Sequence, residues 1–440
     1  MNNNALKTIG INCNNLIEIY KKKYPNLYIQ IKIALQNNHE ITCSISENET
    51  ESNFKNEFNS IKNIINFTTK LILDQKEAIF ICNSLNDLDK NIQSSINSFE
   101  SIPMDEDIVI PNSENIKEYC EQIHCENINI LEEIEMFKQI LINKYKEFLS
   151  NFNGSFEFSI TESCIMILNS KGFVYEKKSK YGNLGFEIST DYNKNKFSYF
   201  NSYFLKDLCY KDIAEEIFKF LKLSIQNTQI KSGTYDCVFS NNYSCFLISS
   251  IISLLDGYLI NNKSSCYFDK LNSQILSSNI SIIDNPLSEE GFIDTYDYEG
   301  TKTKEKILIE KGILKHFLLS SRFAKKFNEL PSGNVFSFSN NCEFSNLFIN
   351  SVNPIKQITS NYILINQIVS DNLNSITGDF KASCSGVLYE NNKEIPFHNA
   401  VIGFNLSDLI NMNLLDEDQK YDFNSAIKTS RVFIPNIKLS

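Results

Sequence analysis

The sequence has no tryptophan, and it also lacks the features of several large classes of protein. Its longest apolar stretch, residues 246–260, is interrupted by three serines, an aspartate and a glycine. That stretch is shorter than the ~20 residues that a helix needs to cross a bilayer. The first ten residues, MNNNALKTIG, lack the apolar run of a secretory signal. We therefore expect a cytoplasmic protein without a membrane segment.

A dense block of basic residues is also missing. The formal net charge is −11, and the two densest clusters of lysine, residues 21–23 and 177–180, are short. Tight binding of nucleic acid depends mainly on lysine and arginine that neutralise phosphates. The charge therefore argues against direct contact with DNA or RNA, and we interpret the two clusters as solvated faces.

The twelve cysteines are scattered singly from Cys13 to Cys384, without the paired spacing of a disulfide scaffold. We expect reduced thiols, most of them buried. The sequence contains no P-loop, no glycine pattern for a dinucleotide after a strand, and no Gly-x-Ser-x-Gly elbow. Common nucleotide-binding and hydrolase sites are thereby excluded.

What is present is a globular composition in a chain too long for one core. The sequence has 440 residues, of which 42% are hydrophobic and 22% charged. We predict two domains, residues 1–230 and 231–440, with the boundary near Lys231-Ser232-Gly233. The fold class is α+β: a mixed N-terminal domain with a β-meander, then a mostly antiparallel β domain with a few helices.

In the N-terminal half, apolar spacing and capping residues predict the elements. Ser84 is a candidate N-cap with Asp87 at the third helical position, for a helix that ends near Phe99. The predicted helices are 16–24, 54–73, 84–99, 129–151 and 212–225. The predicted strands are 27–34, 40–45 and 76–82, followed by a meander over 155–199 with a turn at 169–172.

The C-terminal half reads mainly as strands. The predicted strands are 235–239, 280–283, 304–310, 313–318, 362–369, 382–389 and 431–434 with Ile437. The predicted helices are 243–255, 320–327 and 406–413. An antiparallel sheet fits this order better than a wound parallel one.

Glycine, serine and asparagine recur as turn signals between Asp284 and Gly386. They read Asp284-Asn285-Pro286, GFIDTYDYEG over 291–300, Ser332-Gly333-Asn334 and Ile376-Thr377-Gly378-Asp379-Phe380. Before them stands Ser232-Gly233-Thr234-Tyr235, and after them Val401-Ile402-Gly403-Phe404. This order resembles the C-terminal half of the TldD/PmbA family, bacterial and archaeal proteins associated with a two-subunit metallopeptidase. The resemblance is strong from about residue 232 onwards and weaker over 76–99 and the meander, and the first seventy residues are too divergent to assign.

The family resemblance also defines what is missing. TldD-type chains carry His-Glu-x-x-x-His on the helix after the Ser-Gly-x-Tyr strand, and a later cysteine completes a zinc site. Imidazole and thiolate are zinc ligands, and the glutamate can act as base on the bound water. In this chain the corresponding helix, residues 243–255, has no histidine and no glutamate, and no cysteine follows Cys384. The chain therefore resembles the PmbA (TldE) branch, for which we expect no metal and no catalytic residue.

Two other residue sets could carry chemistry. Cys120, His124 and Cys125 could ligate zinc, but no fourth ligand is evident, so we interpret them as ordinary packing. Of the other histidines, His39 has no second histidine nearby, and we expect His316 and His398 to have no functional role.

The second set is acidic. Four side chains, Asp284, Asp294, Asp297 and Glu299, could serve as a general acid and base. Turn residues that bond to their own backbone are the preferred interpretation, with a turn at 297–300. Gly333 and Gly378 are expected to permit a positive φ or a close backbone approach.

The resemblance implies a non-catalytic subunit of a TldD/TldE-type zinc metallopeptidase that degrades or processes unfolded peptides. Zinc is then expected in a TldD-type partner chain, and extended peptides are the expected substrates. The alternative is a stand-alone homodimeric peptide-binding or scaffold protein, and an enzyme with an unrecognised site remains open. Candidate residues for a peptide groove or an interface are Asp294, Gly300, Ser332, Gly333, Asn334, Thr377, Gly378 and Asp379.

Overall fold

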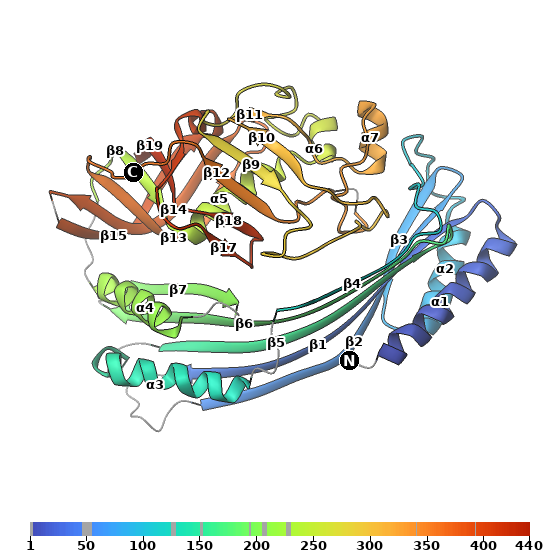
Figure 1. The fold of residues 1–440 in the computed structure, drawn as a ribbon, viewed down its shortest axis with the longest axis horizontal. Coiled ribbons are helices and arrows are strands. Elements are labelled where there is room, and N and C mark those ends of the chain that lie inside the picture. Colours follow the sequence, from blue (N-terminus) through green and yellow to red (C-terminus); the bar gives the residue numbers. More distant parts are fainter. Residues whose placement is uncertain are drawn as a thin grey trace.

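The fold is built on one long curved sheet from the N-terminal half and two sheets from the C-terminal half (Figure 1). The computed structural model describes residues 3–45, 55–124, 129–149, 153–192, 195–204, 209–225, 230–339, 341–391 and 393–440. The C-terminal sheets lie over one face of the long sheet. The predicted α+β class is confirmed.

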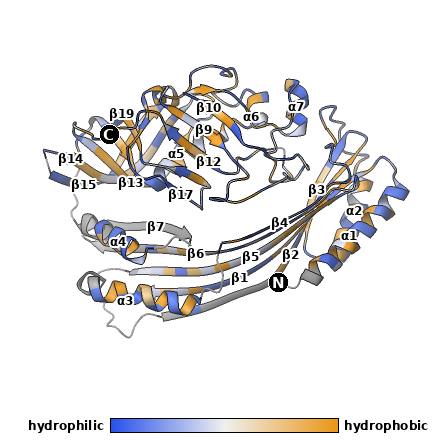
Figure 2. Cartoon of the chain, in the orientation of Figure 1, coloured by the Kyte–Doolittle hydropathy of each residue, from blue (hydrophilic) through white to orange (hydrophobic). Residues whose placement is uncertain are grey.

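The N-terminal sheet has seven strands, in the order β3-β2-β1-β5-β6-β4, with β7 also paired to β6. Their bounds are β1 Tyr28–Ile45, β2 Lys55–Leu73, β3 Lys76–Cys82, β4 Lys117–Ile123, β5 Asn153–Asn169, β6 Val174–Tyr192 and β7 Asn195–Phe204. The pairings are antiparallel, except that β4 runs parallel to β6. Polar and apolar residues follow one another along these long strands, as Figure 2 shows, which is typical of strands with two different faces.

Four helices belong to this half: α1 Asn3–Lys23, α2 Leu85–Ser98, α3 Ile130–Leu149 and α4 Tyr210–Ile225. α1 and α2 lie at one end of the long strands, and α3 and α4 at the other (Figure 1). The predicted cap of α2 is confirmed, because Ser84 Oγ accepts from the Asp87 amide at 3.1 Å. α2 then buries Leu88, Ile92 and Ile96 against the sheet.

The helix predicted over 54–73 is wrong, because residues 55–73 form strand β2. It pairs with β1 from Ile72 back to Lys55, and its register shifts where Gln36 faces Ile64 and Asn38 faces Ile61. The extra residue in β2 interrupts the two-residue period and gives the apolar residues a spacing of three. The break predicted within 27–45 is also wrong, since β1 is continuous.

The C-terminal half forms two six-stranded sheets. One has the order β11-β10-β9-β12-β18-β17, and the other β15-β14-β13-β8-β19-β16. The first set is β9 Ile280–Asp284, β10 Lys306–Glu310, β11 Ile313–Leu314, β12 Leu347–Ser351, β17 Lys420–Asp422 and β18 Ile427–Thr429. The second set is β8 Gly233–Phe239, β13 Tyr362–Leu373, β14 Asp379–Glu390, β15 Lys393–Asn405, β16 Asn413–Leu414 and β19 Val432–Leu439.

A further pairing of β15 with β19 closes the second sheet on itself. Most C-terminal pairs are antiparallel as expected, and β8–β13 and β12–β18 are parallel. The helices of this half are α5 Asn241–Ser253, α6 Gly257–Asn261 and α7 Ser321–Phe327, with a 3-10 helix, η2 Leu406–Asn411. The prediction of an α-helix over 406–413 is therefore corrected to a shorter 3-10 turn.

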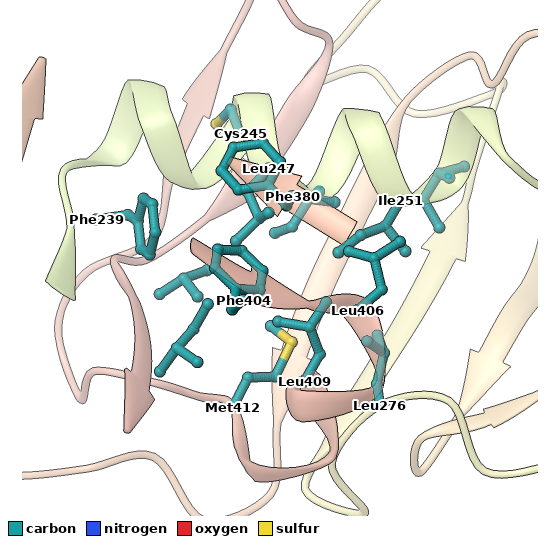
Figure 3. Close-up of a cluster of buried hydrophobic side chains, with 14 of the residues drawn as sticks. Phe239, Cys245, Leu247, Ile251, Leu276, Phe380, Phe404, Leu406, Leu409 and Met412 are labelled. Carbon is teal, nitrogen blue, oxygen red and sulfur yellow. The ribbon is translucent and has the colours of Figure 1, made fainter. Parts of the chain in front are cut away.

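The C-terminal core lies around α5. Cys245, Leu247 and Ile251 of this helix belong to the same buried cluster as Phe380 and Phe404, which come from β14 and β15 (Figure 3). All five are buried. Because α5 is buried along most of its length, its sequence is constrained chiefly by packing.

The two halves are tied together by the loop that follows β9. The side chain of Gln122 on β4 donates to the Gly291 carbonyl and accepts from the Ile293 amide at 2.8 Å. Lys177 on β6 forms an ion pair with Asp294, and both side chains are largely buried. Among the described residues, no helix is long and apolar enough to cross a membrane.

The domain boundary placed at residues 230 and 231 stays a prediction. It falls between α4, which ends at Ile225, and β8, which begins at Gly233. Each of the eleven described cysteines is a free thiol, and all but Cys209 and Cys266 are buried, as expected.

Candidate functional site

The helix expected to carry zinc ligands in a TldD-type chain is α5, and here its polar side chains serve its own packing. Ser244 Oγ donates to the Phe239 carbonyl at 3.0 Å and accepts from the Val432 amide at 2.9 Å. Ser250 Oγ donates to the Phe246 carbonyl at 2.9 Å, one turn earlier. No group of three His, Cys, Asp or Glu side chains arranged to hold a metal occurs among the residues described. A metal-free chain stays a prediction, because only a metal measurement can test it.

A surface groove of about 540 Å³ lies beside β10 in the C-terminal half. We call it the β10 groove. It is lined by Leu271, Lys304, Glu305, Lys306, Ile307, Lys315, His316, Phe317, Leu319, Phe327, Glu329, Leu330, Pro331 and Ser332.

The groove exists because β10 is paired on one side only along its first part. β11 covers β10 at Ile309 and Glu310, and the amides of Lys315 and His316 then donate to the Leu308 carbonyl at 2.8 and 3.4 Å. Beyond that point the chain leaves the strand. Within the described residues, no backbone hydrogen bond joins 304–307 to any segment other than β9. The strand predicted over 313–318 is therefore too long, and its early end exposes the edge of β10.

The rim of the groove is unusually apolar for a surface. Leu330 is 81% exposed, Leu271 is 42%, Ile307 is 40% and Phe327 is 37%. Single exposed apolar residues are common, but several around one hollow are typical of a surface that binds another molecule. The groove is therefore a candidate binding site among the residues that the structure describes.

Behind the groove, a buried ion pair anchors β10 to β9. Asp284 is fully buried and bonds to Lys306 Nζ at 3.0 Å, while Asn334 Nδ2 donates to the same carboxylate at 2.8 Å. The amides of Ser345 and Asn346 donate to its other oxygen at 2.9 and 3.1 Å. All of these contacts are internal, so Asp284 acts as a structural anchor for the strands that carry the groove.

Asp297 and Glu299 also bind backbone amides. Asp297 accepts from the amides of Glu299, Thr301 and Val335 at 2.8–3.2 Å, and the predicted turn at 297–300 is present. Burial and the nearby Glu299 hold the pKa of Asp297 well above its ordinary value. Glu299 in turn accepts from the Ser321 amide at the start of α7. These contacts agree with the preferred interpretation of the acidic set as turn residues.

The structure does not bring the predicted groove or interface residues together. Ser332 lines the β10 groove, and Asn334 lies beneath it, bonded to Asp284. Gly333 has a φ of +73°, and an added Cβ would meet the backbone of residues 302–303 at 3.2 Å. Their involvement in binding peptide stays a prediction.

The remaining candidates lie elsewhere. Asp294 forms the ion pair with Lys177 between the two halves, and Gly300, with a φ of +77°, lies against Ser113 at the same junction. Thr377, Gly378 and Asp379 form an exposed turn closed by Asn405, which donates to the Thr377 carbonyl and to Asp379 at 2.9 Å. Each of these turns is held by its own internal bonds.

The Cys120, His124 and Cys125 set is only partly visible, because Cys125 lies outside the described residues. Cys120 is buried beside the Ile293 carbonyl, and the His124 ring contacts the edges of Phe292 and Phe423. These contacts agree with ordinary packing. Of the other histidines, His316 is exposed on the groove, which the sequence did not indicate, and His398 is half-buried in β15.

Sequence comparison matches residues 232–440 to the PmbA/TldA metallopeptidase C-terminal domain. A metalloprotease PmbA homolog from Haemophilus influenzae is 26% identical over 205 residues, which are 46% of this chain and 45% of that protein. The chain thus matches less than half the length of this relative.

Two solved structures share the fold over nearly the whole chain. A Thermotoga maritima protein named as a modulator of a DNA gyrase is 19% identical, with a TM-score of 0.79, covering 98% of this chain and 100% of that one. TldE from Thermococcus kodakarensis is 17% identical, with a TM-score of 0.77 and the same coverage. Residues 232–440 are thus a PmbA/TldA-type metallopeptidase C-terminal domain, and nearly the whole chain shares the fold of these two structures.

Proposed function

We propose that this chain is a cytoplasmic, non-catalytic PmbA/TldE-like subunit of a TldD/TldE-type zinc metallopeptidase, and that it holds extended polypeptide in the β10 groove. The observation that carries the proposal is the combination of two features. α5 contains no histidine and no glutamate, and an apolar groove lies beside the first part of β10, which is paired only with β9. A TldD-type partner supplies the zinc and the glutamate that activates water.

The groove suits strand addition. An extended peptide that pairs with residues 304–307 uses backbone hydrogen bonds, which depend little on its sequence. Alternate side chains of such a peptide point to opposite sides, so one set meets the apolar rim formed by Leu330 and Phe327. This mode favours unfolded segments, since a folded substrate has its strands already paired.

Binding is tested with carboxymethylated, fluorescein-labelled α-lactalbumin, which stays unfolded, followed by fluorescence anisotropy. Leu330→Asp places a charge on the groove rim at a side chain that is 81% exposed, so the fold should tolerate it. We expect this variant to weaken binding at least about tenfold, because burying a leucine is worth about 2 kcal/mol.

The matched control is Leu131→Asp. Leu131 is 45% exposed and belongs to α3, which lies far from α7 and the groove (Figure 1). Equal binding by the parent, Leu330→Asp and Leu131→Asp would show that the groove does not hold polypeptide.

The subunit role is tested by metal content and by assembly. Mass spectrometry of the purified chain should give zinc well below one equivalent, whereas about one tightly held equivalent would contradict the proposal. Co-expression with a TldD-type chain from the same genome should give a complex that light scattering measures as two different chains. A homodimer that does not bind the co-expressed TldD-type chain would favour the stand-alone peptide-binding alternative.

A further inference from the structure

We propose that the N-terminal half holds the α7 side of the β10 groove in place through two ion pairs, so that peptide binding is coupled to the junction between the halves. Asp105 and Asp107 are then positioning residues for the groove, although neither of them lines it. This inference rests on the proposed peptide-binding function and adds how the binding site is kept in shape.

Part of the groove's apolar rim belongs to the chain that leaves α7. Phe327 is the last residue of the helix, and Leu330, the most exposed of the four rim residues, follows three positions later. This connection is tied to the helix, because the Glu329 amide donates to the Ala324 carbonyl at 2.8 Å. The position of the rim therefore follows the position of α7.

α7 makes a small apolar contact with its own half. Its two buried residues, Phe323 and Ala324, form a cluster with Leu319 that is separate from the main C-terminal core. The Phe323 ring also lies edge-on to Tyr258 of α6, with ring centroids 6.1 Å apart, in addition to the bond that Glu299 accepts at the start of α7. An element with so little buried apolar surface opens at a lower cost than the core does.

A loop of the N-terminal half contacts α7 through two ion pairs, which we call the α7 clasp. Arg322 bonds to Asp105, and Lys326 Nζ lies 2.5 Å from Asp107 Oδ2. The two cations are four positions apart and so lie on the same face of the helix. The loop is itself anchored at the turn between β2 and β3, since the Asp105 amide donates to the Gln75 carbonyl at 2.8 Å. The α7 clasp thus joins the rim of the groove to the N-terminal sheet.

The four charged side chains of the clasp are 20–44% exposed. Ion pairs of this kind are individually weak, and salt screens them. Because α7 has few other contacts to hold it, two such pairs still change how often it leaves its place. The frequency of such local opening is what amide hydrogen exchange measures.

The test is hydrogen exchange of the full chain, with mass spectrometry of the segments 105–108 and 322–332. Asp105→Asn/Asp107→Asn removes both negative charges of the clasp. We expect exchange at least about threefold faster in both segments at 50 mM salt, as two weak pairs allow. Raising the salt to 500 mM should accelerate exchange in the parent and change the variant little, since the variant has no clasp left to screen.

The matched control is Asp371→Asn/Asp418→Asn, which neutralises two exposed aspartates of β13 and of the chain before β17. Exchange in both segments should equal that of the parent. A charge exchange gives a second control, because Asp107→Lys alone should accelerate exchange and Asp107→Lys/Lys326→Asp should return it towards the parent rate. A role of Asp107 that did not depend on pairing with Lys326 would not be rescued in this way.

Coupling to the groove is tested by repeating the exchange with carboxymethylated α-lactalbumin. A polypeptide that packs on the rim holds α7 in place, so exchange of 105–108 on the other half should slow at least about twofold in the parent. In Asp105→Asn/Asp107→Asn the polypeptide should still bind, but exchange of 105–108 should not respond.

The outcomes separate this inference from the function on which it rests. Equal exchange in the parent and in Asp105→Asn/Asp107→Asn would refute the clasp. Slower exchange of 322–332 on binding, without any change at 105–108, would refute the coupling and leave peptide binding intact. Failure of α-lactalbumin to bind the parent would overturn the proposed function and the coupling with it, while exchange without polypeptide would still decide whether the clasp holds α7.

Discussion

Removing the carboxylate of Asp284 should destabilise the C-terminal half more than any other single change we consider. The side chain is fully buried and receives bonds from Lys306 Nζ, Asn334 Nδ2 and the amides of Ser345 and Asn346 at 2.8–3.1 Å. Asp284→Ala leaves the Lys306 ammonium buried without its partner, which costs about 3–5 kcal/mol. The three other donors lose their acceptor as well, at about 1–3 kcal/mol for each one that cannot relax.

We therefore expect a loss of at least about 4 kcal/mol for Asp284→Ala. At about 2–4 °C per kcal/mol for a unit of this size, the midpoint of thermal unfolding should fall by about 8 °C or more. Differential scanning fluorimetry measures the shift, with circular dichroism at 20 °C to check that the variant is folded.

The matched control is Asp269→Ala, which removes an exposed aspartate whose ion pair with Lys270 is also exposed. Its midpoint should move by less than about 2 °C, because exposed pairs contribute about 0–1 kcal/mol. Adding Lys306→Met to Asp284→Ala should recover part of the loss, since no buried charge is then left unpaired. A fall in the melting midpoint of less than 2 °C for Asp284→Ala would refute the argument that the bonds of Asp284 stabilise β9 and β10.

Three further changes test other parts of the fold. Burial raises the pKa of Glu417, but the bonds from Arg431 lower it more, so its pKa lies below the ordinary value. The pair therefore stabilises the fold at neutral pH, and the difference in melting temperature between the parent and Glu417→Gln should shrink as pH falls from 7 to 3. A difference that stays constant over this range would contradict the prediction. Gly312→Ala should clearly lower the midpoint of urea unfolding, because Gly312 has a φ of +77° and an added Cβ would lie 2.2 Å from a backbone carbonyl oxygen. An unchanged midpoint would show that the loop can rearrange to accept the methyl group at little cost. Gln122→Leu removes both bonds to the loop 291–293, so hydrogen exchange of those amides should accelerate at least about fivefold, while equal exchange would mean that packing alone holds the loop.

Local signals in the sequence predicted those elements whose causes are local. Ser84 and Asp87 predicted the start of α2 because a cap depends on residues three positions apart. Gly300 and Asp297 predicted their turn for the same reason. β2 was predicted as a helix because the register shift opposite Gln36 depends on pairing with β1, which no local window contains.

The groove could not be predicted from the sequence because it is defined by where a pairing stops. Residues 313–318 were predicted as one strand, yet β11 ends at Leu314. Leu318 instead bridges Asp256, so the chain is drawn away from β10. The local sequence signal for the groove is Leu330, a leucine beside Pro331 in a loop. It could not be recognised as part of a groove, because the other lining residues are far from it in the sequence.

The pairing of β1 with β5 runs without a register shift from Gln30 opposite Asn169 to Ile45 opposite Gly154. Along such a ladder, inserting one residue would turn every later side chain to the opposite face. Evolution of this half can therefore exchange exposed side chains more easily than it can change the length of these strands, because a length change in one strand needs a matching change in its partner. When homologous sequences are aligned, the gaps should fall in the connections between the long strands, and the strands themselves should provide the reliable register for comparing distant relatives.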